Sequence, residues 1–419
     1  MPLVPVEEAR RHVLDSCGVL PAEVVPVGDA LGRVTAAEVV SPEAVPPFAN
    51  TAMDGYAVRA AETSGASDDL PVTLRVARSI AAGQPPGPPL SPGEAIRIMT
   101  GAPLPPGADA VVMVERTRPA RSVAGGDAVQ ILAEADRGDH VRHPGEDVRP
   151  GDTVVGPGTE LRPAHLGVLA SVGVTMVEVH GRPRVGVLST GDELVEGGGA
   201  LEPGQIRDSN RRTLLGLLRE SGFEAVDLGI ARDTEMEITA ALDRGVGECD
   251  ALLTSGGVSV GDFDYVKAVL DSRSGGTMRW MQVAVRPAKP FAFGLVAGVP
   301  VFGLPGNPVS SMVSFELFAR PALRQMAGHA GAARFRPTVP AVAGQDFPRR
   351  PDGRLALDRV VAQVGEGGRV VVRSAGGQGS HVLSAMARAN ALALIPDGPG
   401  LAAGDGLTVW LLGDLLTGP

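Results

Sequence analysis

Glycines, carboxylates and small hydroxyl residues follow two predicted strands of this 419-residue chain. The strand at 184–189 leads into Thr190-Gly191-Asp192-Glu193-Leu194, and the strand at 251–254 leads into a glycine-rich turn at 255–264. Consecutive small residues let backbone N–H groups point toward an anion, and a following helix adds its positive end. The second turn therefore fits a phosphate cradle, with a flexible linker as the alternative. The first turn alone is equally typical of an ordinary Asx turn.

A third strand-to-helix transition has the sequence Leu304-Pro305-Gly306-Asn307-Pro308-Val309-Ser310-Ser311. Asn307 suits a helix cap and Pro308 the first helical position, so capping alone is one explanation. A third such transition in one region favours an anion site instead. Nearby, Arg286 and Lys289 supply two cations that could hold an oxyanion or pyrophosphate.

Five acids lie in glycine-rich or loop contexts without any cluster of His or Cys beside them: Asp54, Asp147, Glu193, Asp233 and Asp264. Carboxylates without imidazole or thiolate suit a hard cation such as Mg²⁺, bound together with substrate phosphates. Asp54 and Asp147 belong to segments that, as pure sequence, also read as hairpins.

The elements that must position these residues fall into regions of different character. Helical spacing predicts a helix over 6–19, and short Val-rich runs up to about residue 178 predict a β-dominated part. After residue 180, strands alternate with helices at 210–220 and 234–246, which indicates βαβ units and a mostly parallel sheet with ligands at the carboxyl ends of its strands. A helix at 308–326 precedes short alternating strands, which predict a small C-terminal β domain.

We therefore divide the chain into four parts. These are a connecting helix/β domain (1–45 and 141–178), an inserted β-rich domain (46–140), an α/β domain (179–330) and a C-terminal, β-barrel-like domain (331–419). The fold class is multidomain α/β plus β.

Composition excludes several classes of function. A net charge of −10 argues against a nucleic-acid-binding surface, and no apolar run is long enough to span a membrane. The N-terminus has no signal-peptide pattern, so we expect a cytoplasmic location. Cys17 and Cys249 are too few for a disulfide framework and are expected to be buried.

Six motifs in this order resemble the molybdopterin molybdenumtransferase family, which includes the E domain of gephyrin. They are Met53-Asp54-Gly55-Tyr56-Ala57-Val58, Arg97-Ile98-Met99-Thr100-Gly101-Ala102-Pro103, Gly145-Glu146-Asp147, Ser189-Thr190-Gly191-Asp192-Glu193-Leu194, Ser255-Gly256-Gly257-Val258-Ser259 and Leu304-Pro305-Gly306-Asn307-Pro308. Each motif is weak alone, but together they are specific and cover nearly the whole chain.

The resemblance implies an α/β domain like that of the molybdopterin adenylyltransferases and an elongated homodimer with a composite active site. It implies a transferase in which molybdate displaces AMP from adenylylated molybdopterin with Mg²⁺ assistance, giving molybdenum cofactor. A molybdopterin adenylyltransferase is a further candidate partner.

The resemblance also implies the site residues. The catalytic set is Asp54, Thr100, Asp147, Glu193, Asp233 and Asp264, of which Glu193, Asp233 and Asp264 are assigned to the metal. Phosphate binding falls to Ser255, Gly256, Gly257 and Ser259, and the third turn contributes Pro305, Gly306, Asn307 and Pro308. The molybdate pocket comprises Arg286, Lys289, Pro290, Ser310 and Ser380.

The chain departs from the family where a Lys-Pro-Gly-Lys-Pro loop is common. Arg286 and Ala288 replace the first Lys and the Gly, and Gln282 stands where a Lys often occurs. Two other functions stay open: a non-catalytic scaffold that uses this fold to bind a protein ligand, as gephyrin's E domain also does, and a pterin adenylyltransferase. A scaffold would not need the five acids, and an adenylyltransferase would not need the Met53–Val58 region or the C-terminal domain.

Overall fold

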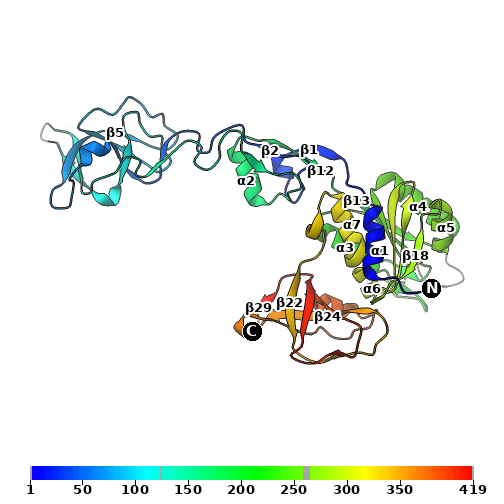
Figure 1. Cartoon of the computed structure of the whole chain (residues 1–419). Helices are drawn as coiled ribbons and strands as arrows, with labels where there is room; N and C mark the ends of the chain where they lie inside the picture. Colours follow the sequence, from blue (N-terminus) through cyan, green and yellow to red (C-terminus); the bar gives the residue numbers. More distant parts are fainter. Residues whose placement is uncertain (1, 123–124, 258–264, 418–419) are drawn as a thin grey trace.

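The computed structural model describes residues 2–122, 125–257 and 265–417. The chain is elongated, with a β-rich domain at one end and an α/β domain and a β domain together at the other (Figure 1). A slender connecting domain joins the two ends. Among the described residues, no helix combines the length and apolar character needed to cross a membrane.

Short antiparallel ribbons build the connecting domain. Strand β1 (Ala22–Pro26) pairs with β12 (Met176–His180), and β2 (Val39–Val40) pairs with β11 (Thr153–Val155). Helix α2 (Pro163–Ser171) covers these ribbons, and Leu169 on its inner face is fully buried. Toward the β-rich domain, the chain crosses through the pairing of β3 (Asn50–Thr51) with β10 (Val141–Arg142).

A six-stranded sheet in the order β7-β4-β6-β5-β9-β8 forms the β-rich domain. Its alternating burial places one apolar cluster around Val58 and Val129 and another around Ala57 and Ile96. The strands are β4 (Gly55–Val58), β5 (Val72–Ile80), β6 (Glu94–Ile98), β7 (Ala110–Met113), β8 (Thr117–Arg121) and β9 (Asp127–Ile131).

The α/β domain contains a six-stranded sheet in the order β16-β13-β17-β21-β20-β18. Its first four strands are parallel, which confirms the predicted mostly parallel sheet. They are β16 (Glu224–Ala231), β13 (Arg184–Thr190), β17 (Ala251–Ser255) and β21 (Val299–Leu304), and the antiparallel edge comprises β20 (Pro290–Val296) and β18 (Arg279–Gln282). The apolar faces of α3 (Asn210–Glu220), α4 (Glu235–Glu248) and α5 (Tyr265–Arg273) pack on this sheet.

The predicted helix at 308–326 is divided into α6 (Pro308–Ser314), a π-helical turn (Phe315–Ala319) and α7 (Arg320–Met326). Pro321 lacks an N–H, which accounts for the break in the regular ladder. Helix α1 (Val6–Asp15) contributes Ala9 and Val13 to the core of the α/β domain, although sequence reasoning had grouped it with the connecting domain.

The C-terminal domain is a closed barrel. The strands follow one another as β24-β25-β22-β28-β26, and β26 pairs again with β24. They are β22 (Thr338–Ala343), β24 (Leu355–Val364), β25 (Val370–Ser374), β26 (Ala391–Ile395) and β28 (Gly406–Leu411), with α8 (Leu383–Arg388) beside them. Strand β19 (Val285–Arg286), which belongs to the α/β domain in sequence, adds to β24 in parallel. The multidomain α/β plus β fold class is therefore confirmed.

Candidate active site

The carboxyl ends of β13, β17 and β21 border a small polar cleft of about 100 Å³. Three of the segments singled out by sequence meet here, because parallel strands end at the same edge of a sheet. The predicted residues that line the cleft are Glu193, Ser255, Gly256, Gly306 and Pro308. Hydroxyls from Ser189, Thr190 and Ser209 add hydrogen-bonding groups.

Glycine suits two positions of these turns because of its backbone conformation and the space it leaves. Gly191 has φ of +145°, which residues with a side chain rarely adopt, and the Glu193 carboxylate lies against it: a Cβ would be 2.3 Å from Oε2. At Gly257, with φ of +68°, a Cβ would lie 2.3 Å from Cβ of Val266. Ser259 and Asp264 lie outside the described residues.

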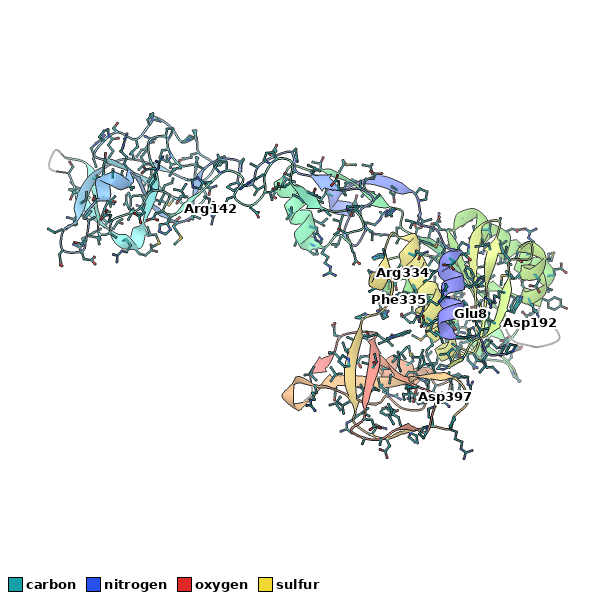
Figure 2. All side chains as sticks on the ribbon, in the orientation of Figure 1. Glu8, Arg142, Asp192, Arg334, Phe335 and Asp397 are labelled. Carbon is teal, nitrogen blue, oxygen red and sulfur yellow. The ribbon has the colours of Figure 1, made fainter. Side chains whose placement is uncertain are left out.

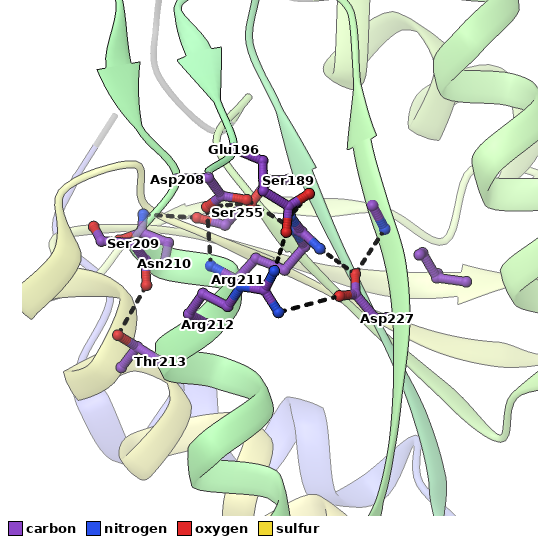
Figure 3. A network of polar contacts seen from close by, with 12 residues as sticks. Ser189, Glu196, Asp208, Ser209, Asn210, Arg211, Arg212, Thr213, Asp227 and Ser255 are labelled. Atoms are coloured by element: carbon purple, nitrogen blue, oxygen red, sulfur yellow. Dashed lines mark hydrogen bonds and ion pairs between the residues drawn. The ribbon is translucent and has the colours of Figure 1, made fainter. Parts of the chain in front are cut away.

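Asn210, the first residue of α3, links two of the turns. Its Nδ2 donates to Oγ of Ser255 at 2.8 Å (Figure 3). The same nitrogen donates to the carbonyl of Gly306 at 2.7 Å. One amide therefore fixes the end of β17 relative to the turn after β21. This holds the spacing across the polar cleft.

A buried ion network lies directly behind Asn210. Arg211, with its side chain 2% exposed, donates from Nε to Asp208 at 2.8 Å and also contacts Asp227 (Figure 3). Asp208 in turn accepts from the Oγ of Ser189 at 3.1 Å. Burial acts to raise the pKa of Asp227, but the hydrogen bonds from Arg211 and from the N–H of Gly229, together with the charges of Arg211 and Arg212, lower that pKa overall. The network anchors the start of α3 to the end of β13.

A second cavity, of about 440 Å³, lies between the α/β domain and the barrel. Among the described residues that line it, Arg286, Lys289 and Arg354 are cations and none is a carboxylate. It brings together every residue that sequence reasoning placed in a molybdate pocket: Arg286, Lys289, Pro290, Ser310 and Ser380. Three cations converging on hydroxyls are suited to a tetrahedral oxyanion.

Ser380 lies in a loop of the barrel that Arg359 holds in place through hydrogen bonds. Arg359 is fully buried, and its Nη2 donates to the carbonyls of Gly377 and Gly379, each at 3.4 Å. Gln378 accepts from the backbone N–H of Arg359 and donates back to its carbonyl, both at 2.9 Å. From the other side, the N–H of Val309 in α6 donates to the carbonyl of Ser380 at 3.0 Å.

The third turn divides the two cavities. Gly306 and Pro308 line the polar cleft, whereas Asn307 and Ser310 line the cationic cavity. The side chain of Asn307 makes no capping hydrogen bond to α6, so helix capping does not account for this residue. Pro305 is buried just before the turn.

The departures of the loop at 282–290 have visible consequences. Ala288 has φ of +81°, a left-handed conformation that glycine adopts without strain, which explains why a glycine suits this position. Gln282 is not among the described residues lining the cationic cavity, whereas Arg286 keeps a charge within it.

Two carboxylates at the carboxyl ends of β13 and β16 lie close together. The backbone N–H of Asp233 donates to Oδ1 of Asp192 at 3.2 Å, and burial followed by the charge of Asp192 raises the pKa of Asp233. A cation would relieve this repulsion, so the pair fits part of a Mg²⁺ site. Within the described part of the chain, however, no three Asp, Glu, His or Cys side chains converge as a complete metal site.

Asp54 and Thr100 lie together at the far end of the molecule. Oδ1 of Asp54 accepts from both the backbone N–H and the hydroxyl of Thr100, each at 2.7 Å, and these bonds lower the pKa of Asp54. Asp147 is exposed in a loop, where its backbone N–H donates to the carbonyl of Val45 at 3.0 Å. In Figure 2, Arg142 of the strand preceding this loop lies in the β-rich part of the elongated molecule, and Asp192 lies across the connecting domain in the α/β domain. One subunit therefore does not bring the two groups of acids together.

Sequence reasoning overlooked Asn210, Arg354 and Arg359. Asn210 immediately precedes an apolar helical pattern and resembled an ordinary helix start. Arg354 follows Pro351-Asp352-Gly353, which reads as a surface turn, and Arg359 is a charged residue inside a strand pattern. The neighbouring sequence does not distinguish these three residues from solvent-exposed polar residues, because the groups that they contact come from distant segments of the chain.

The fold and the two cavities define a multidomain α/β protein with a cationic cavity shared between its α/β domain and a β barrel. Three family models match consecutive parts of the chain: the MoeA N-terminal region (domain I and II) over residues 4–173, a probable molybdopterin binding domain over 186–325, and the MoeA C-terminal region (domain IV) over 340–412.

Full-length relatives agree with these matches. The molybdopterin molybdenumtransferase 2 of Mycobacterium tuberculosis is 42% identical, covering 97% of this chain and 98% of its own. The molybdopterin molybdenumtransferase of Haemophilus influenzae is 37% identical with the same coverage of both chains. A crystal structure of the molybdopterin biosynthesis MoeA protein of Pyrococcus horikoshii superposes with a TM-score of 0.79 at 33% identity, covering 99% of this chain and all of that one. The chain belongs to the molybdopterin molybdenumtransferase family.

Proposed function

We propose that this protein inserts molybdenum from molybdate into adenylylated molybdopterin and releases AMP. The observation that carries the proposal is the arrangement of two cavities on opposite sides of the turn at 305–308. One has three cations and suits an oxyanion, and the other has the glycine turn and hydroxyls that suit a phosphate. If the phosphates of the adenylylated pterin bind in the polar cleft, its dithiolene sulfurs would lie beside molybdate in the cationic cavity.

In the cationic cavity, Arg286, Lys289 and Arg354 would hold molybdate by charge-assisted hydrogen bonds, assisted by the hydroxyls of Ser310 and Ser380. Asp352 accepts from Nε of Arg354 at 3.0 Å and so fixes the direction of that guanidinium. Placing molybdate next to the dithiolene makes metal insertion effectively intramolecular.

In the polar cleft, Ser255 and Gly256 would contact the phosphates of the substrate, with Asn210 keeping the surrounding turns at the correct spacing. As the phosphoanhydride bond to AMP breaks, negative charge grows on the departing phosphate, and fixed N–H donors stabilise it. An oxygen of molybdate, or of water, bonds to the phosphorus of AMP as the P–O bond of the anhydride breaks, and the bridging oxygen stays on the pterin phosphate. The two dithiolene sulfurs replace oxygen ligands of molybdenum, which leave as water with the thiol protons.

The acids Asp192 and Asp233 would hold Mg²⁺ together with the substrate phosphates, and Glu193 and Asp264 are the further carboxylates assigned to it. When bound, the cation would neutralise the charge that develops on the phosphate. Glu193 lines the cleft, and its carboxylate would orient a water there.

The distant position of Asp54, Thr100 and Asp147 supports a composite site in a homodimer. In a twofold arrangement, the β-rich end of one subunit can cover the α/β domain of its partner. Asp54, kept ionised by Thr100, would then face the partner's bound substrate. We place the enzyme in the cytoplasm, and we retain a molybdopterin adenylyltransferase as a candidate docking partner.

A single-turnover reaction with purified adenylylated molybdopterin tests the function. AMP should appear only when molybdate is added, together with a pterin product that activates a molybdenum-free apoenzyme, and without any use of ATP. Consumption of ATP with unmodified molybdopterin would instead indicate an adenylyltransferase. Binding of the pterin without AMP release under any of these conditions would favour the scaffold.

A further inference from the structure

A third cavity, of about 250 Å³, lies where the connecting domain meets the α/β domain. The connecting side contributes Arg33 and Arg182, and the α/β side contributes Arg320 and Arg324 of α7. Arg336, at the start of the C-terminal domain, completes a ring of five arginines. None of the described residues that line this cavity also lines the cationic cavity at Lys289.

Carboxylates do not balance these arginines. Only Glu160 and Glu220 line the cavity with them among the described residues. Glu160 is already engaged by Nη2 of Arg324 at 3.0 Å and by Nε2 of His329 at 2.9 Å. Glu220 is 3.6 Å from Arg336 and half exposed. Outside the lining, Glu23 pairs with Arg33 and Glu316 pairs with Arg336. Among the described residues, Arg182 and Arg320 are therefore the lining cations that carboxylates match least.

Arg320 is a buried cation whose hydrogen-bonding groups are poorly matched by the described residues. It is 7% exposed, and its Nε has no hydrogen-bond partner among the described residues. The nearest carboxylate, Glu316, is 3.9 Å away and already accepts two hydrogen bonds from Arg336, at 3.0 and 2.8 Å. The Nη1 of Arg320 donates a long hydrogen bond of 3.4 Å to the carbonyl of Arg334. A buried charge without a matched partner is unfavourable unless a ligand supplies one.

The electrostatics agree with this geometry. Burial, reinforced by the neighbouring charges of Arg336 and Arg324, lowers the pKa of Arg320 to about 10. The ring of His329 is also buried, and burial together with the charge of Arg324 lowers its pKa. Guanidinium groups supply the cations that face a ligand, and they bind tetrahedral oxyanions through paired N–H donors.

We propose that this junction cavity is a second oxyanion site, which binds a phosphate group and is separate from the molybdate pocket. The bound phosphate would be contacted by Arg320 from the α/β domain and by Arg182 from the end of the connecting domain. It would fix the angle at which the connecting domain leaves the α/β domain. In this way it would set the position of the β-rich end that carries Asp54.

Hydrogen exchange with inorganic phosphate tests the site without relying on catalysis. At ionic strength matched with chloride, phosphate should slow exchange in the segments 180–183 and 320–329. Arg320→Gln should raise the phosphate concentration for half-protection by about tenfold or more, as expected when a charge-assisted hydrogen bond is lost. Arg182 is exposed, so Arg182→Ala cannot disturb the core and should weaken binding in the same direction.

Two controls locate the effect. Arg273→Ala removes an exposed arginine that pairs with Asp243 and should change nothing, and Lys289→Ala should leave protection of the junction unaltered. Protection by AMP at lower concentration than phosphate would identify a nucleotide as the source of the phosphate group, and protection by phosphate alone would identify the free anion. Protection confined to 285–290 and 376–381, or protection at the junction that neither arginine variant reduces, would overturn the proposal.

Discussion

Arg286 of the α/β domain pairs in parallel register with Ala356 of the C-terminal barrel. The N–H of Leu355 donates to the carbonyl of Ala284 at 2.9 Å, so the loop and the barrel are joined by backbone hydrogen bonds. Lys289 follows three residues later, and Arg354 immediately precedes β24. The oxyanion pocket is therefore assembled across a domain boundary by strand pairing.

This arrangement predicts that Arg354 binds molybdate as directly as Lys289 and Arg286 do. Replacing any one of the three by Ala should raise the molybdate concentration for half-maximal insertion by about tenfold or more, for a loss of roughly 1.5–3 kcal/mol per contact. Arg350→Ala removes an exposed arginine of the same segment and serves as the control. An unchanged molybdate dependence in the three variants would reject the pocket.

Asn210 should act by positioning the phosphate cleft. Asn210→Ala removes the donors to Ser255 and Gly306, and it should raise the KM for the adenylylated pterin by up to about thirtyfold, since two bonds of roughly 1 kcal/mol each are lost. The molybdate dependence should stay as in wild type, because Asn210 does not line that cavity. Arg219→Ala, at the exposed end of the same helix, is the matched control. Equal KM values for Asn210→Ala and wild type would exclude the positioning role.

The pH profile should report the bond between Thr100 and Asp54. In the folded protein the pKa of Asp54 lies below its ordinary value, so the carboxylate stays ionised as the pH falls until that lower pKa is reached. Thr100→Val removes the hydroxyl donor and should move the acid limb of kcat/KM to higher pH. Thr100→Ser should restore the limb. A limb that does not move in Thr100→Val would show that ionised Asp54 is not required.

Arg211 should stabilise the α/β domain. Arg211→Leu leaves the buried Asp208 without its ion-pair partner and should lower the free energy of unfolding by about 3–5 kcal/mol. The pKa of Asp227 is lowered in the folded state, so its contribution is present above the unfolded pKa of about 4 and is lost as the pH falls through the folded value. The difference in stability between wild type and variant should therefore shrink in acid. Denaturant unfolding at pH 7 and pH 3 measures both effects.

Mixing inactive subunits tests the composite site. Dimers formed from Asp54→Ala and Asp233→Ala subunits should contain one intact site and one doubly damaged site. With random exchange at equal amounts, half the dimers are mixed, so about a quarter of all sites should be restored. A refolded mixture no more active than either variant alone would place all the acids of one site within one subunit.

Local sequence was sufficient for the strands β13 and β17, the helices α3 and α4, and the turns that follow these strands. Helix α3 begins and ends at the residues expected from its apolar spacing, and the turns after β13, β17 and β21 meet because parallel strands end at one edge. Periodicity and glycine placement are properties of neighbouring residues, so they can be recognised without a structure. The motif order likewise predicted the family, and the similarity to known proteins confirmed it.

Tertiary structure alone decided which side chains share a cavity. Arg354 reaches the pocket because β24 pairs with β19, and Arg359 supports Ser380 because the barrel closes around it. Asn210 is meaningful only beside Ser255 and Gly306, which lie 45 and 96 residues away in the chain. The buried Arg320 reads in the sequence as an ordinary helical cation. Burial and partner choice depend on contacts between distant segments, and no local pattern encodes those contacts.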